Sequence, residues 1–348
     1  MRSYLYTIAT GKSKGFIPAI IKLLLLPLSL IYGLVVRFLA FFYTLRSYRL
    51  PCKVISIGNI TLGGTGKTVL VEFVSRYLKE KGHKVAILSR GYKRSDACSL
   101  GDEPYMLKRQ LEDIPVIVNP DRIKAAEEAV RDYGVDTVVL DDGFQQWRIK
   151  KDLEIVLVDA TEPFGNGRLL PAGILRQPLS ALRQADILFL SKVDLSPGYL
   201  KAKDFLSRIN PGALIFESIH KPLGFYGLGN NQELFRPEAF KAETVALISG
   251  IGSPDSFEGL IKGLGINIGL SFRFPDHHHY SEEELRGLIR QAKEKNITKI
   301  ITTEKDAVRI ISLGPVDYGL PIFVLRIALK IIENEEGFCN RLLKLYSF

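Results

Sequence analysis

The sequence predicts an α/β fold, a mostly parallel sheet with helices on both faces. Two observations predict it. Short apolar runs of three to five residues alternate with helical patterns from residue 54 onward, and strands that alternate with helices form parallel sheets. One of these runs leads directly into a glycine-rich turn and a helix, which is typical of a phosphate-binding loop. A separate apolar and basic segment precedes this region.

Residues 1–48 are predicted to form a membrane-associated helix that acts as an anchor. Phe16–Tyr43 is strongly apolar, and seven of the nine net positive charges lie in residues 1–50, which contain no acid. These basic residues punctuate an apolar stretch, which favours an anionic membrane surface and argues against nucleic acid as a partner. The longest uncharged run, Leu23–Val36, contains Pro27 and is shorter than the roughly 20 residues of a spanning helix. A tilted or partial span and a helix lying in the interface are therefore both open.

A nucleotide-binding domain is expected over residues 49–222. Ligands of parallel sheets bind beyond the carboxyl ends of the strands, so functional residues should directly follow strands. The expected strands are Val54–Ile57, Val85–Leu88, Val116–Val118, Thr137–Leu140, Glu154–Val158 and Ile187–Leu190, and the expected helices are Val69–Lys81 and Arg122–Asp132.

A second, smaller α/β lobe is expected over residues 223–348. The glycine-rich Gly224–Gly229 is interpreted as a connector that opens this lobe. The expected strands are Val245–Ser249, Lys299–Thr302 and Ile322–Leu325, with helices from about Asp255, over Glu282–Lys295 and at the C-terminus. The chain's three cysteines have no paired spacing, which argues against a disulfide framework or a zinc ribbon.

The strongest motif is the phosphate loop, Gly58–Thr68. Backbone N–H groups of such a turn and the N-terminus of the next helix bind phosphate oxygens, while Lys67 reaches the outer phosphates and the Thr68 hydroxyl reaches Mg²⁺. The usual spacing places a glycine where this chain has Thr61, so the loop is a variant. The residues expected to bind nucleotide here are Gly63, Gly64, Thr65, Gly66, Lys67 and Thr68.

Acidic residues occur at two further places of interest. Asp141 and Asp142 follow an expected strand, where a carboxylate that organises Mg²⁺ is typical; capping of the next turn is the alternative. Asp102 and Glu103 are candidate general bases, although acids at such a position also begin ordinary helices.

Three consecutive histidines, His277–His279, follow Asp276. Adjacent residues rarely ligate one metal ion, so one histidine paired with a carboxylate in a proton relay is favoured over a metal site.

Ser191–Asp194 weakly resembles the guanine-reading motif of GTPases. Arg122 and Lys305 are candidate phosphate contacts.

In this order the motifs resemble one family, the lipid A 4′-kinases (tetraacyldisaccharide 4′-kinases) of Gram-negative bacteria. The family also carries the variant loop. The motifs are Gly58-Asn59, Gly63–Thr68, Ser89–Tyr92, Gly101–Pro104, Arg122, Leu140–Gln145, Leu169–Gly173, Gly250–Gly252, Phe274–His278 and Thr303–Asp306.

The resemblance implies a P-loop NTPase-like fold and an ATP-dependent kinase. Its substrate would be the 4′-hydroxyl of a tetraacyl glucosamine disaccharide 1-phosphate, and its product lipid IVA. It also implies a place on the cytoplasmic face of the inner membrane, with no protein partner expected. The residues implied are Lys67, Arg122 and Gln145 for ATP, Thr68, Asp141 and Asp142 for Mg²⁺, and Asp102 paired with His277 as the base.

The chain departs from the family pattern in three ways. Gln177 stands where glutamate is common, and the stretch between Tyr92 and Gly101 is short, so that a hairpin there is expected to be missing. The histidine run also makes His278 a second choice after His277 as the partner of Asp102.

The main alternative function is a membrane-bound GTPase or ATPase switch, which Ser191–Asp194 would support. A scaffold with a relict loop is another.

Overall fold

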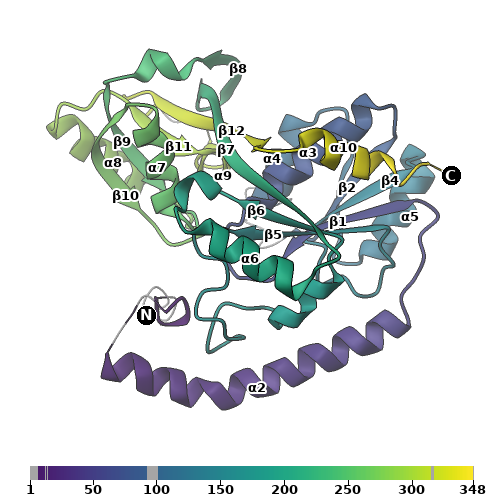
Figure 1. Cartoon of the computed structure of the whole chain (residues 1–348). Helices are drawn as coiled ribbons and strands as arrows, with labels where there is room; N and C mark the ends of the chain where they lie inside the picture. Colours follow the sequence, from purple (N-terminus) through teal and green to yellow (C-terminus); the bar gives the residue numbers. More distant parts are fainter. Residues whose placement is uncertain (1–6, 12, 14, 92–100, 315–316, 348) are drawn as a thin grey trace. The chain divides into compact units, whose positions relative to one another are not determined.

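The computed structural model describes residues 7–11, 13, 15–91, 101–314 and 317–347. The chain divides into two compact units, whose segments can be followed by the sequence colours of Figure 1. Unit 1 comprises Met1–Arg90, Leu111–Ile219 and Lys330–Phe348, and unit 2 comprises Gly91–Gln110 and His220–Leu329.

The units differ from the expected domains at two segments. Gly91–Gln110 belongs to unit 2, because its helix packs against a helix near residue 308, and Lys330–Phe348 returns to unit 1. The expected absence of a hairpin between Tyr92 and Gly101 falls on residues 92–100, outside the described ones. Among the described cysteines, Cys52 and Cys339 are free thiols.

Unit 1 is built on a parallel sheet in the order β3-β2-β4-β1-β5-β6-β7. All six strands expected for this domain are present, which confirms the parallel α/β fold. The strands are β1 (Lys53–Asn59), β2 (Val85–Ser89), β3 (Val116–Val118), β4 (Thr137–Asp141), β5 (Leu153–Asp159), β6 (Ile187–Ser191) and β7 (Leu214–Gly227), the last of which continues into unit 2.

Helices cover both faces of this sheet. Helices α5 (Arg122–Tyr133) and α6 (Tyr199–Ile209) pack on the face that carries Val54 and Val156. Helices α3 (Lys67–Glu80) and α10 (Glu335–Leu343) cover the other face, where Phe338 packs against Phe73 and Phe189. Because both faces are buried, the strands are continuous apolar runs in the sequence. A short 3₁₀ helix, η1 (Leu179–Gln184), precedes β6 and another, η2 (Val193–Leu195), follows it.

In unit 2 the strands follow the order β10-β9-β11-β12-β7, with β8 antiparallel to β7. Helix α7 packs on one face through Phe257, and α8 packs on the other through Leu285. The elements are α4 (Asp102–Gln110), β8 (Asn230–Phe235), η3 (Pro237–Phe240), β9 (Thr244–Ser249), α7 (Pro254–Gly263), β10 (Asn267–Arg273), α8 (Glu282–Glu294), β11 (Ile300–Thr303), α9 (Glu304–Ile311) and β12 (Ile322–Ile331).

The interpretation of Gly224–Gly229 as a connector is wrong, because β7 continues through Gly227. A Cβ atom on Gly224 would lie 2.4 Å from the backbone oxygen of Phe235. The glycine therefore permits β8 to approach β7 closely, which is a role of glycine inside strands.

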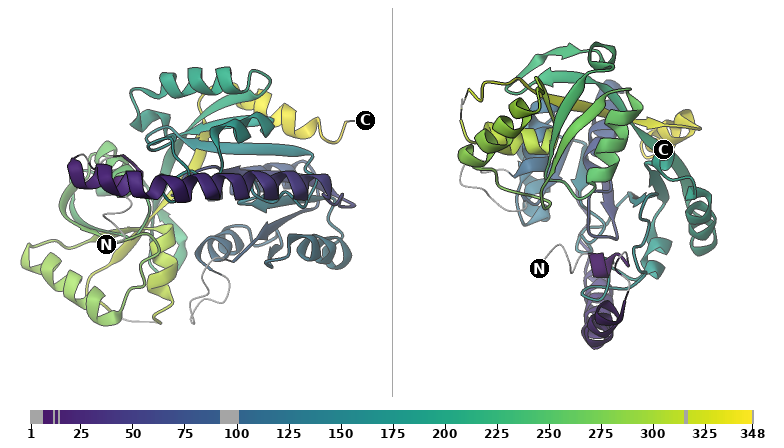
Figure 2. Two further views of the ribbon diagram at one scale, coloured as in Figure 1. Left: turned by 90° about the horizontal axis from the view of Figure 1, so that it is seen from below. Right: turned by 90° about the vertical axis from the view of Figure 1, so that its left-hand side faces the viewer.

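The N-terminal apolar segment forms α2 (Phe16–Leu45), one continuous helix in both views of Figure 2 although Pro27 lies inside it. Its length and composition would allow it to cross a membrane: its most apolar window has a mean hydropathy of 2.3 and is 17% buried. Its large exposed apolar side chains include Phe16, Ile17, Leu23, Leu24, Leu30, Ile31, Leu34, Phe38, Phe41 and Leu45.

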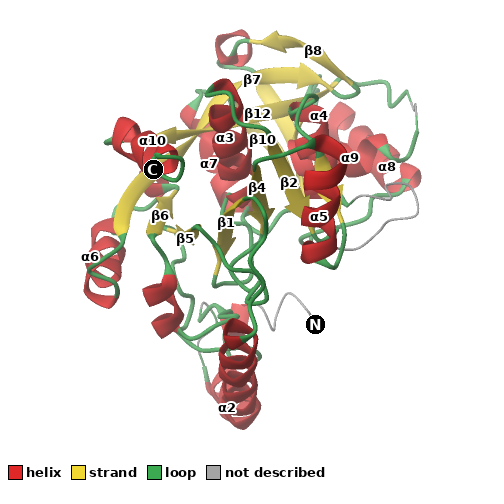
Figure 3. Cartoon of the chain, turned by 90° about the vertical axis from the view of Figure 1, so that its right-hand side faces the viewer, coloured by secondary structure: helices red, strands yellow, loops and turns green. Residues whose placement is uncertain are grey.

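Helix α2, itself part of unit 1, contacts the rest of that unit through the middle of its length. The Ser29 hydroxyl donates to the Leu169 carbonyl at 2.8 Å, and the Tyr32 hydroxyl donates to the Arg176 carbonyl at 3.0 Å. Gly33 lets the helix approach Leu169, since a Cβ there would lie 2.7 Å from that side chain. In Figure 3 the segments between α2 and the strands are loops and short helical turns.

Candidate active site

The phosphate loop connects β1 to α3 at the carboxyl edge of the unit 1 sheet. Gly63 and Gly66 have φ angles of 115° and 89°, in the left-handed region that favours glycine. Register pairs Ile57 of β1 with Asp141 of β4. The loop and the acids that follow β4 therefore lie at the same edge of the sheet, as the sequence predicts.

The Lys67 ammonium lies beside two polar side chains, and a second cation binds one of them. Its Nζ is 3.1 Å from Asn59 Oδ1 and 3.3 Å from Asp142 Oδ1, and Arg176 Nη1 donates to Asp142 Oδ2 at 2.7 Å. Burial raises the pKa of Asp142, but the charges of Lys67 and Arg176 outweigh this and lower it. Asp142 is therefore ionised at neutral pH, and it has a left-handed φ of 56°. Arg176 was not predicted, although it adjoins Gln177.

The other residues expected at the nucleotide site lie nearby in unit 1. Arg122 is buried and donates to the Asn119 carbonyl at 2.7 Å. Burial lowers its pKa to about 10, a shift that the negative charge of Asp141 opposes. Gln145 donates to the Asn59 carbonyl at 2.9 Å. Gln145 therefore lies against the loop, and Arg122 lies within electrostatic range of Asp141 and Asp142.

The donors at this edge fit Mg²⁺. Thr68, Asp141 and Asp142 offer the hydroxyl and carboxylate oxygens that this hard cation prefers. The described residues contain no cluster of three or more His, Cys, Asp and Glu side chains that could hold a metal ion. Mg²⁺ usually takes one or two protein carboxylates and completes its shell with phosphate and water oxygens.

Unit 2 brings Asp102, His277 and Arg309 together. Asp102 begins α4, and its Oδ2 lies 3.0 Å from His277 Nδ1. The same oxygen accepts from Arg309 Nε at 2.8 Å and Nη2 at 2.6 Å. We call these three residues the Asp102 cluster. Of the other histidines, His278 contacts Glu284 at 2.7 Å, and His279 is exposed.

The Asp102 cluster keeps its carboxylate ionised. Burial raises the pKa of Asp102, but hydrogen bonds from His277 and Arg309 outweigh it and lower the value to about 2. The hydrogen bond to Asp102 in turn raises the pKa of His277. His277 also has a left-handed φ of 61°, a strained conformation that accumulates at functional sites.

Arg309 is a residue that sequence reasoning missed. It lies on α9, three residues after Asp306 of the Thr303–Asp306 motif, with 4% of its side chain exposed. Its Nη1 donates to the Gly250 carbonyl at 2.8 Å and to Asp306 Oδ1 at 3.0 Å. These bonds fix the guanidinium, so that its remaining donors face Asp102.

The neighbouring Lys305 forms an ion pair with a carboxylate. Its Nζ lies 2.7 Å from Glu103 Oε1. Burial raises the pKa of Glu103, but the Lys305 charge outweighs this and lowers it to about 2. Lys305 therefore neutralises Glu103 in this structure, which accounts for both residues without a phosphate contact.

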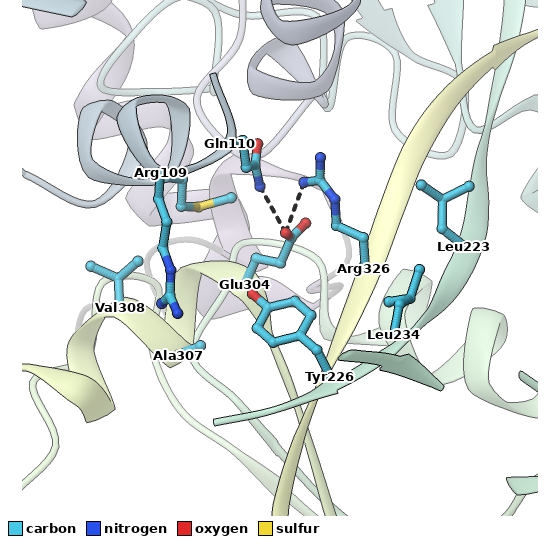
Figure 4. Close-up of a pocket in the computed structure, with 10 residues that line it drawn as sticks. Arg109, Gln110, Leu223, Tyr226, Leu234, Glu304, Ala307, Val308 and Arg326 are labelled. Carbon is cyan, nitrogen blue, oxygen red and sulfur yellow. Dashed lines mark hydrogen bonds and ion pairs between the residues drawn. The ribbon is translucent and has the colours of Figure 1, made fainter. Parts of the chain in front are cut away.

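A pocket of about 240 Å³ lies within unit 2, between α4, α9 and strands β7, β8 and β12. Figure 4 shows Glu304 inside it, accepting from Gln110 at 2.7 Å and from Arg326 at 2.8 Å. The Arg326 charge is thus matched by a buried carboxylate.

Gln177 is buried, with 2% of its surface exposed. Its Oε1 accepts no hydrogen bond from the described residues. A neutral amide leaves this position without the negative charge that glutamate would bring.

Comparison with known proteins identifies the chain's relatives. A family model described as tetraacyldisaccharide-1-P 4′-kinase (LpxK) matches residues 21–347. The chain belongs to this family. A tetraacyldisaccharide 4′-kinase of Anaeromyxobacter dehalogenans (strain 2CP-C) is 37% identical, covering 84% of this chain and 81% of its own length. That of Halothermothrix orenii is 33% identical, covering 95% and 94%.

A solved structure supports the same relationship. LpxK from Aquifex aeolicus, crystallised in complex with ATP, superimposes with a TM-score of 0.71. It is 28% identical and covers 94% of this chain and 100% of its own. The kinase is therefore favoured over the GTPase switch and the relict scaffold.

Proposed function

We propose that this protein transfers the γ-phosphoryl group of ATP to the 4′-hydroxyl of a tetraacyl disaccharide 1-phosphate. The 4′-oxygen forms a bond to the γ-phosphorus, and the bond between that phosphorus and the β–γ bridging oxygen breaks. The products are ADP and the bisphosphorylated lipid, lipid IVA. The observation that carries the proposal is the phosphate loop with Lys67 at the edge of the sheet, in a chain of this family.

In this proposal the residues of unit 1 bind the nucleotide and neutralise the negative charge of its phosphates. Phosphoryl transfer depends mainly on positioning and on stabilising the charge of the phosphoryl oxygens. Lys67 binds the outer phosphates, and Arg122 and Gln145 support the nucleotide. Thr68, Asp141 and Asp142 would hold Mg²⁺, which supplies positive charge between the phosphate oxygens when bound.

The Asp102 cluster would provide the base. Its carboxylate is ionised, so it can orient the sugar hydroxyl and accept its proton, while the hydrogen bond to His277 holds the carboxyl group in position. Arg309 holds the carboxylate in place. A pKa of about 2 makes Asp102 a weak base; a loose transition state, in which proton transfer comes late, needs no stronger one.

One assay tests the function. Purified full-length protein in detergent receives Mg²⁺, the disaccharide monophosphate lipid and either ATP or GTP, and the bisphosphate product is measured. Product with ATP is expected, and Lys67→Met should abolish most of it while Lys79→Met, a surface lysine on the same helix, should not. Protein that binds ATP and yields no product would reject the kinase.

We also propose that α2 attaches the protein to the cytoplasmic face of the inner membrane while lying in the interface. Its middle residues Ser29, Tyr32 and Gly33 contact the rest of unit 1, and a spanning helix would carry those polar contacts into the hydrocarbon core. Its exposed apolar side chains would enter the acyl boundary.

Truncation tests the anchor. Deleting residues 1–45 should abolish binding to vesicles that contain anionic lipid and leave ATP binding intact, because the phosphate loop lies in a later segment. Vesicle binding by the truncated chain equal to that of the full chain would contradict the proposal.

A further inference from the structure

Two buried polar side chains of unit 1, Ser191 and Lys192, contact the phosphate loop, and a third, Asp159, pairs with Lys192. None of the three has a part in the proposed chemistry. Ser191 ends β6, Lys192 follows it, and Asp159 ends the adjacent strand β5, paired in register with Ser191. Their exposed fractions are 0%, 3% and 9%. We call them the loop brace. Ser191 and Lys192 belong to the Ser191–Asp194 motif, which the proposed function leaves unused.

The loop brace binds two consecutive carbonyl groups of the phosphate loop. Ser191 Oγ donates to the Thr65 carbonyl at 2.8 Å, and Lys192 Nζ donates to the Gly64 carbonyl at 2.9 Å. Lys192 also forms a buried ion pair with Asp159. Asp159 Oδ1 is held in turn by the backbone N–H of Thr161 at 2.9 Å.

Fixing these carbonyls also aims the N–H groups of the loop. In a trans peptide unit the C=O and the following N–H point in opposite directions. With the carbonyls of Gly64 and Thr65 turned toward the brace, the N–H groups of Thr65 and Gly66 point away from it. These N–H groups immediately precede the N-terminus of α3, where an anion is favoured.

The loop needs such support because its glycine residues allow its backbone to adopt many conformations. A Cβ atom on Gly64 would meet nothing within 4 Å, so no neighbouring group packs against the side of this residue where a side chain would lie. Glycine loses more conformational entropy on ordering than any other residue. Lys192 itself has a left-handed φ of 59°, which a non-glycine residue keeps only where its surroundings impose it.

We propose that Ser191, Lys192 and Asp159 are positioning residues that pre-organise the phosphate loop for ATP. The inference rests on ATP as the ligand of the proposed function. The loop brace touches no phosphate; it acts through the carbonyls of Gly64 and Thr65. It therefore affects nucleotide affinity, and leaves binding of the lipid substrate unchanged.

Variants of the loop brace can separate an effect on the position of the phosphate loop from an effect on the stability of the fold. Lys192→Met alone leaves Asp159 buried without a charged partner, which destabilises folds strongly. The double variant Lys192→Met with Asp159→Asn removes both charges, and the amide retains an oxygen for Thr161. Ser191→Ala removes one hydroxyl. Lys203→Met is the matched control, because it breaks a lysine–carboxylate pair with Glu217 elsewhere in unit 1.

The experiment is ATP titration of the full-length protein by calorimetry, with the KM values for ATP and lipid and the melting temperature of the free protein. The double variant should raise the Kd for ATP about 10-fold or more, the scale of losing a charged hydrogen bond. Ser191→Ala should raise it roughly 3-fold or more. In both, the KM for ATP should rise and the KM for lipid should not. Lys203→Met should bind ATP as the wild type does.

The outcomes are distinct. Wild-type affinity in Ser191→Ala and in the double variant would overturn the inference while leaving the kinase proposal intact. If the double variant does not fold, Ser191→Ala decides alone. Equal rises in the KM values for ATP and lipid would also overturn it, because they would indicate general loss of structure. Wild-type protein that binds no ATP would overturn both proposals.

Discussion

The phosphate loop of unit 1 and the Asp102 cluster of unit 2 are assembled in opposite ways. The loop is one continuous stretch whose anion-binding groups are backbone N–H groups set by local turn geometry. The Asp102 cluster joins side chains 175 and 207 positions apart in the sequence. A local site can therefore be recognised from spacing, whereas a dispersed site depends on how distant helices pack.

The two regions also hold their carboxylates differently. Asp142 lies between Lys67 and Arg176, two cations that would also attract phosphate. Asp102 is paired with Arg309, whose remaining bonds go to Gly250 and Asp306 inside unit 2. The first carboxylate thus belongs to a site that can exchange partners for a ligand, and the second to a fixed network.

Removing the charge of Asp102 should give the largest effect. In Asp102→Asn the turnover number should fall between about 10²-fold and 10⁴-fold, because the proton acceptor is lost. The Kd for ATP should stay at its wild-type value, since the phosphate loop is untouched. Asp204→Asn, at an exposed position on α6, is the control. Near-normal turnover in Asp102→Asn would reassign Asp102 to a structural role.

Removing Arg309 tests whether the network is fixed. Arg309→Met should lower the free energy of unfolding by about 3 kcal/mol, because Asp306 is fully buried and loses its charged partner. Urea unfolding at neutral pH measures this. Arg286→Met, which breaks an exposed pair with Glu282, should change it by less than about 0.5 kcal/mol. Equal effects of the two substitutions would contradict a fixed network.

The smallest expected effect is on the titration of His277. Its hydrogen bond to Asp102 raises its pKa above the ordinary 6.5, so the pair's stabilisation is complete below that pH and is lost as the pH rises through the raised value. In Asp102→Asn the pKa of His277 should fall. Histidine NMR signals followed against pH measure it, and an unchanged pKa would show that the Asp102 contact does not govern this residue.

The sequence predicted the fold of unit 1 better than that of unit 2. The strands of unit 1 are buried on both faces and give clear apolar runs, whereas β10 is largely exposed along its length. Strand β7 was not predicted, and the two glycines in its second half led to its interpretation as a connector, since glycine usually signals a turn. Strand β8 and helices α6 and α9 were also not predicted.

The sequence by itself determined the parallel α/β fold and the phosphate loop, because strand periodicity and turn chemistry are local properties of the chain. Only the tertiary structure decided which of three histidines meets Asp102, that Arg309 joins them, and that Ser191 and Lys192 hold the loop's carbonyls. Those contacts join elements far apart in sequence. Their existence depends on packing directions that spacing along a chain does not encode.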